Sequence, residues 1–156
     1  MKHLCQPASV VLLIASVVSV LGQPAARTKR GNEAIAQAAI QAVLAAQRDA
    51  WNRGDIEAYM DGYDRSPRTE FVGGDSISRG WQTVLDRYKQ KYDTREKMGM
   101  LTFSEIDIKL LSKDAALVLG RWRLKRANDE PHGTFTLLFR KTKAGWRIVH
   151  DHSSSA

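Results

Sequence analysis

Residues 100–127, MLTFSEIDIKLLSKDAALVLGRWRLKRA, decide the fold, because they hold two long alternating segments separated by one short polar turn. In the first segment, Ile106, Ile108 and Leu110 fall on one face of a strand. In the second, one face is shared by apolar side chains and one glycine: Val118, Gly120, Trp122 and Leu124. Alternation of this kind predicts two antiparallel strands that pack one face against the rest of the protein.

The sequence on either side extends the same sheet. GTFTLLFRKTK (133–143) and AGWRIVHDHSS (144–154) follow as two further strands, and TEFVGGDSISRGW (69–81) predicts a short hairpin. Helical periodicity comes earlier, in a long alanine-rich segment from residue 33 to 53 and in a short segment that follows Asp55. A third helix is predicted in WQTVLDRYKQKY, residues 81–92. Helices followed by strands indicate an α+β fold, in which a cone-shaped, curved antiparallel β-sheet packs against about three N-terminal helices.

The N-terminal residues have a different composition. The apolar run of residues 10–21 is shorter than the roughly 20 residues that a membrane-spanning helix needs, and it suits the core of an export signal. We therefore expect a signal peptide over 1–22, a disordered linker over 23–32 and one domain over 33–156. The expected location is periplasmic or secreted, without stable membrane association after cleavage. An uncleaved N-terminal membrane anchor is the alternative.

Cysteine content and charge exclude several classes of function. Cys5, the only cysteine, precedes the apolar run, so a cleaved chain has no disulfide, thiolate metal site or cysteine nucleophile. The net charge is +7, but the basic residues are spread out and accompany no recognised nucleic-acid motif. A nucleic-acid partner is therefore not expected.

Several stretches together carry a resemblance to a known family. AWNRGDIEAYMDGY (50–63), FVGGDSISRGW (71–81), LTFSEIDI (101–108), ALVLGRWRL (116–124) and the end of the chain from 133 to 154 resemble the SnoaL-like branch of the nuclear transport factor 2-like superfamily. More narrowly, they are similar to the small bacterial SgcJ/EcaC domains.

The resemblance implies a cone-shaped sheet closed by three helices, and a homodimer formed through the open face of the sheet. The superfamily contains isomerases, cyclases and dehydratases, and also scaffolds and oligomerisation modules without a pocket, so fold alone does not establish an activity. A related kinase association domain also ends in a Trp-x-x-Val-His-x-His-x-Ser pattern, which here begins at Trp146 and ends at Ser154.

The two histidines of the last predicted strand are candidate site residues. Simple alternation places His150 and His152 on the packed face with Trp146 and Ile148, which predicts that both imidazoles project into the cone. They could bind a ligand, and His150 could transfer a proton. The alternative is a metal site, which would need a third ligand such as Glu57 or Asp61 from the second helix.

Acid–base chemistry is the favoured mechanism. The resemblance places AYMDGY near a helix that carries catalytic residues in some relatives, which implies Asp61 as the base and Tyr63 as a hydrogen-bond donor. Solvated aspartates and a core tyrosine are the alternative. No metal or other cofactor is assigned.

Three further residues are expected to bind the ligand. Trp51 and Trp122 could line the pocket, and Gly120 would leave a gap beside Trp122. Arg79 could pair with a ligand carboxylate. The sequence thus predicts a small-molecule-binding domain, with catalysis on a hydrophobic or carbonyl-bearing metabolite as one hypothesis and a non-catalytic binding or oligomerisation module as the other.

Overall fold

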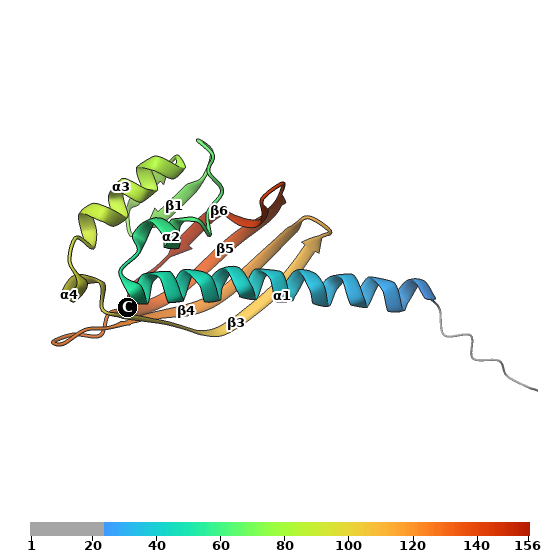
Figure 1. Ribbon diagram of the computed structural model, residues 1–156, viewed down its shortest axis with the longest axis horizontal. Helices are drawn as coiled ribbons and strands as arrows, with labels where there is room; N and C mark the ends of the chain where they lie inside the picture. The colour runs from blue at the N-terminus through green and yellow to red at the C-terminus, as the bar shows by residue number, and fades with distance from the viewer. Residues whose placement is uncertain (1–23) are drawn as a thin grey trace, which may run out of the picture.

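The computed structural model describes residues 24–156, in which one mixed β-sheet is covered on one face by helices (Figure 1). The predicted signal peptide, residues 1–22, lies outside the described residues. The helices are α1 (Pro24–Arg53), α2 (Ile56–Met60), α3 (Trp81–Lys91) and α4 (Arg95–Met98). The strands are β1 (Glu70–Gly73), β2 (Ser76–Arg79), β3 (Met100–Ser112), β4 (Ala115–Lys125), β5 (His132–Thr142) and β6 (Gly145–Ser153).

The predicted α+β class, with a curved sheet against N-terminal helices, is confirmed, and its strand pairing differs in one place. The strands lie in the order β2-β1-β6-β5-β4-β3, and β3 to β6 form the expected antiparallel meander. The hairpin β1–β2 joins this meander through β1, which runs parallel to β6. The sheet is therefore mixed, because α3 and α4 carry the chain from the hairpin to the far edge before the meander begins.

Helix α1 starts earlier than the sequence predicts. Residues 24–32, expected to belong to a disordered linker, are helical, so one helix runs from Pro24 to Arg53 and its N-terminal part extends beyond the sheet (Figure 1). Ala25, Ala26 and the basic residues of this segment favour such extension, because alanine, arginine and lysine have high helix propensities. None of the helices in the described part of the chain combines the length and apolar character required to span a bilayer.

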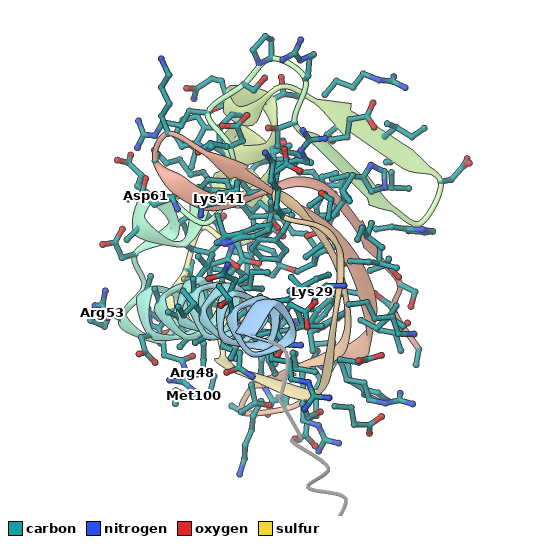
Figure 2. All side chains as sticks on the ribbon, turned by 90° about the vertical axis from the view of Figure 1, so that its right-hand side faces the viewer. Lys29, Arg48, Arg53, Asp61, Met100 and Lys141 are labelled. Atoms are coloured by element: carbon teal, nitrogen blue, oxygen red, sulfur yellow. The ribbon has the colours of Figure 1, made fainter. Side chains whose placement is uncertain are left out.

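The C-terminal half of α1 anchors the core. Ile40, Leu44 and Trp51 are buried against the sheet. Asn52 fixes the helix end to β3, since its side chain donates a hydrogen bond to the carbonyl of Leu101 at 3.1 Å and accepts one from the Leu101 amide at 2.7 Å. Figure 2, which looks along α1, shows the sheet curving around this helix. The curvature leaves a hollow between the helices and the sheet.

Candidate functional site

A cavity of about 310 Å³ lies between the helices and the concave face of the sheet. Most of its wall is apolar or aromatic, from α1, α2, α3 and all the long strands. Its aromatic side chains are Trp51, Tyr59, Tyr63, Phe71, Tyr88, Tyr92, Phe103, Trp122 and Phe135. Asp151 is the one acidic residue in this lining.

An irregularity in β6 determines which side chain of that strand enters the cavity. Opposite Leu138 and Phe139, the register of β6 shifts, so that His150 and Ile148 face consecutive residues of β5 and Val149 is the extra residue. An extra residue of this kind is a β-bulge, and it reverses the alternation of the residues that follow. Asp151, not His150 or His152, therefore shares the inner face with Ile148.

The expectation that both histidines project into the cone is therefore wrong. His150 is half-buried, with 37% of its side chain exposed, and its Nδ1 lies 3.2 Å from Glu70 Oε2. His152 is exposed. Neither belongs to the cavity lining.

Asp151 is the buried polar centre of the cavity, with 4% exposure. The hydroxyl of Tyr63 donates a hydrogen bond to its Oδ2 at 2.6 Å, and the hydroxyl of Ser153 donates one to its Oδ1 at 2.7 Å. A carboxylate has about four acceptor sites, so two remain available to a bound molecule. The two donors hold the carboxyl group in one orientation.

The segment after α2 places Tyr63 beside this carboxylate. Gly62 and Asp64 pair with Ile148 of β6 through the hydrogen bonds Ile148 N–H to Gly62 O, 2.9 Å, and Asp64 N–H to Ile148 O, 2.8 Å. Gln47, buried on α1, donates to the carbonyl of Tyr59 at 3.1 Å and packs against the backbone of Gly62, where a Cβ would collide with it. Helix α1 and strand β6 thus fix the position of the tyrosine from both sides.

Burial raises the pKa of Asp151 above its ordinary value of 3.8. The hydrogen bonds from Tyr63 and Ser153 act in the opposite direction, because they stabilise the charged form, but the desolvation of the carboxylate outweighs them. A carboxyl group with a raised pKa can take up and return a proton closer to neutral pH than a solvated one.

The neighbouring tyrosines remain hydroxyl donors. Burial raises the pKa of Tyr59, Tyr63 and Tyr88, and the charge of Asp151 raises all three further. Tyr59 and Tyr88 lie in ring contact, with centroids 5.3 Å apart, and both line the cavity. Their protonated hydroxyls can donate hydrogen bonds to an oxygen atom of a ligand.

The structure brings three of the predicted site residues to the cavity: Trp51, Tyr63 and Trp122. Trp51 packs edge-on against Tyr59 and Tyr92, and its indole donates to the carbonyl of Met98. Trp122 donates to the carbonyl of Ser154, which fixes the C-terminal residues near it. The predicted gap beside Gly120 is absent, because the ring of Phe135 and the side chain of Ile106 fill that space.

Asp61 and Arg79 lie outside the cavity. The Asp61 side chain is 60% exposed, pairs with Arg65 and lies at the outer edge of the molecule (Figure 2). Arg79, 65% exposed, pairs with Glu70, the same carboxylate that contacts His150. These hydrogen bonds, that from Arg79 first and that from His150 second, lower the pKa of Glu70. The geometry therefore does not support Asp61 as the base.

The described residues contain no cluster of side chains that could bind a metal ion. Within 24–156, no three histidine, cysteine, aspartate or glutamate side chains gather as metal ligands would. Glu57, one suggested third ligand, instead pairs with Lys89 at 2.6 Å.

Asp151 and Ser153 are two site residues that the strand pattern does not predict. Simple alternation puts both on the face opposite Trp146. The available signal was chemical, since an aspartate between two histidines near the end of a strand is an unusual residue for a sheet interior. The bulge that turns it inward depends on the pairing with β5 and has no signature within β6 itself.

Known proteins similar to this chain share its fold. The SnoaL-like domain family matches residues 40–156. A crystal structure of a nuclear-transport-factor-2-like protein of unknown function from Shewanella oneidensis MR-1 is 44% identical, with a TM-score of 0.73, and the match covers 76% of this chain and 98% of that one. No curated protein matches the sequence.

Two more distant structures are similar in fold alone. A provisionally named scytalone dehydratase from Novosphingobium aromaticivorans DSM 12444 is 11% identical, with a TM-score of 0.69 over 81% of this chain and 88% of that one. A protein from Xanthomonas campestris, provisionally named a calcium/calmodulin-dependent protein kinase II association domain, is 15% identical. Its TM-score is 0.61 over 75% of this chain and 85% of that one.

Proposed function

The chain belongs to the SnoaL-like domain family, and we propose that it is an acid–base enzyme that moves a proton on a small hydrophobic carbonyl compound without a cofactor. The observation that carries this proposal is Asp151, a buried carboxyl group with a raised pKa and two fixed hydrogen-bond donors, at the wall of an aromatic cavity. A non-catalytic binding module needs no such group.

The proposed roles follow from the geometry. Asp151 removes a proton from the carbon next to the carbonyl group and later returns it, and Tyr63 and Ser153 keep its carboxylate oriented. The enolate oxygen that develops accepts hydrogen bonds from Tyr59 or Tyr88, whose raised pKa values keep their hydroxyls protonated. The burial of Asp151 among aromatic side chains lowers the local polarity and strengthens these interactions.

Isomerisation, cyclisation and dehydration all use this proton transfer. The dehydratase name of one distant relative is compatible with it, but at 11% identity that likeness extends to the fold alone. Within the family, the motifs WNRGD, RGW and GWRIVHDH support assignment to the SgcJ/EcaC subtype. The same proposal includes export through the N-terminal signal, which the apolar run of residues 10–21 supports. It also includes a homodimer formed through the open face of the sheet, which the family resemblance supports.

Proton exchange provides a direct test. In deuterated buffer, β-tetralone, a two-ring ketone, exchanges the hydrogens next to its carbonyl group, and NMR follows their loss. We expect the protein to accelerate this exchange, and Asp151→Asn to reduce the acceleration by about 100-fold or more, the usual contribution of a general base. Asp61→Asn is the matched control, since Asp61 is exposed and lies outside the cavity. Exchange no faster than in buffer, or equal rates for Asp151→Asn and the unaltered protein, would contradict the proposal.

A further inference from the structure

Two basic side chains of α3 line the same cavity as Asp151. Arg87 and Lys91 are four residues apart, so they lie on one face of the helix. With Asp151 as the one acidic residue in the lining, cationic groups outnumber anionic ones there. The cavity therefore favours a ligand that carries negative charge.

The guanidinium of Arg87 is held in place. Its Nη1 donates to the hydroxyl of Ser78 at 3.2 Å, and its Cζ lies 4.8 Å from the centroid of the Phe71 ring. Gly73 lacks the Cβ that would approach Arg87 Nη2 to 3.3 Å, and so leaves room for it. One of five N–H groups is used in this arrangement, which leaves a fixed fork of donors for a carboxylate.

Neither cation has an acidic partner in the part of the chain that the structure describes. Among the described residues, Arg87 and Lys91 form no ion pair with an aspartate or glutamate. Lys89, between them in sequence but outside the cavity lining, pairs with Glu57 at 2.6 Å. The two cations at the cavity are thus available to a ligand.

Burial changes from one end of the lining to the other. Lys91, Gly74 and Ser155 are exposed and Arg87 is half-buried, whereas Asp151 and Tyr63 are buried. The cations therefore lie at the mouth of the cavity and the carboxyl group lies at its floor. A volume of about 310 Å³ is near the lower end of the usual range for ligand pockets, about 300–1,000 Å³, and suits one or two rings.

We propose that the ligand is a one- or two-ring carboxylic acid, whose carboxylate binds Arg87 and Lys91 at the mouth while its carbonyl or enol oxygen reaches the floor. This inference rests on the proposed function, because it places the reacting end of the molecule beside Asp151. The charge at the mouth sets the orientation, and the aromatic wall accepts the rings between the two ends.

Two isosteric fluorescent probes test the inference. One is a hydroxynaphthoate with its hydroxyl and carboxylate at opposite ends of the rings, and the other is its neutral amide. We expect the carboxylate to bind at least about tenfold more tightly than the amide at low ionic strength, the value of one charge-assisted contact. The preference should shrink as salt screens the mouth.

Variants separate this inference from the proposed chemistry. Lys91→Gln and Arg87→Met should each remove most of the preference for the carboxylate and leave the affinity for the amide within about twofold. Lys89→Gln is the matched control and should keep the full preference. Asp151→Asn should also keep the preference while it abolishes proton exchange, so the two proposals fail independently. Equal binding of the two probes, an unchanged preference in both mouth variants, or no binding of either probe would overturn the inference.

Discussion

Replacement of Tyr63 by phenylalanine tests whether the Tyr63–Asp151 hydrogen bond controls the charge of the cavity. The substitution removes one oxygen atom from a fully buried ring and leaves the rest of the packing intact. It deprives Asp151 of the donor at 2.6 Å, and Ser153 is then the one side-chain donor to Asp151 among residues 24–156. The variant thus removes the hydrogen bond to Asp151, together with the contacts that the Tyr63 hydroxyl makes with the hydroxyls of Tyr59 and Tyr88.

The size of the effect depends on the protonation state of Asp151. A hydrogen bond to a charged group contributes about 1.5–3 kcal/mol, and one between neutral groups about 0.5–1.5 kcal/mol. We therefore expect Tyr63→Phe to lower the free energy of unfolding by about 2 kcal/mol where Asp151 is ionised and by about 1 kcal/mol where it is protonated. The difference corresponds to a further rise of roughly one unit in the pKa of Asp151.

The sign of the pH dependence follows from linkage. The native-state pKa of Asp151 already lies above its ordinary value of 3.8, and loss of a donor to the carboxylate raises it further. Below the ordinary value both proteins carry a protonated Asp151, so the variant has its smaller deficit. The deficit grows between the native pKa of Asp151 in the unaltered protein and its higher native pKa in the variant. In that pH range the Asp151 carboxyl group ionises in the unaltered protein and stays protonated in the variant.

Urea unfolding from about pH 4 to about pH 8 measures this deficit, and carboxyl NMR follows the titration of Asp151 directly. Tyr92→Phe is a suitable control, since Tyr92 also lines the cavity and its hydroxyl makes no hydrogen bond to another described residue. In an Asp151→Asn background, Tyr63→Phe should lose its pH dependence. A deficit that is the same at both ends of the pH range, or that keeps its pH dependence without Asp151, would refute the reasoning.

Three further predictions concern stability. Compared with Asp151→Asn, the unaltered protein should have its largest relative stability below pH 3.8 and should lose it as pH rises through the raised native pKa of Asp151. Thermal unfolding of both proteins across pH measures the difference, and a difference that does not change with pH would contradict this. Gly120→Ala should cost about 1–3 kcal/mol, because its Cβ would collide with the Phe135 ring, and Phe135→Leu should partly restore the melting temperature. Asn52→Ala should cost about 1–3 kcal/mol in urea unfolding through the loss of both hydrogen bonds to Leu101, and Asn52→Asp, which keeps the acceptor, should cost less.

The sequence alone determined the fold class and the order of its elements. Alternation along residues 100–127 predicted two strands that share an inner face, and Ile106, Ile108, Val118 and Leu124 all pack toward the core. These predictions succeeded because burial of an apolar face depends on period, which a local window of sequence contains. Two predicted ligand-binding residues, Trp51 and Trp122, line the cavity, and so does Tyr63, which the family resemblance implied.

Tertiary structure decided which polar group occupies the site. The bulge at Val149 arises from the pairing of β6 with β5, and it moves Asp151 inward and the two histidines outward. The parallel pairing of β1 with β6 then brings Glu70 to His150, on the side away from the cavity. A period of two residues assigns every side chain of a strand to one face, but a single extra residue reverses that assignment, and only the partner strand determines where the extra residue falls.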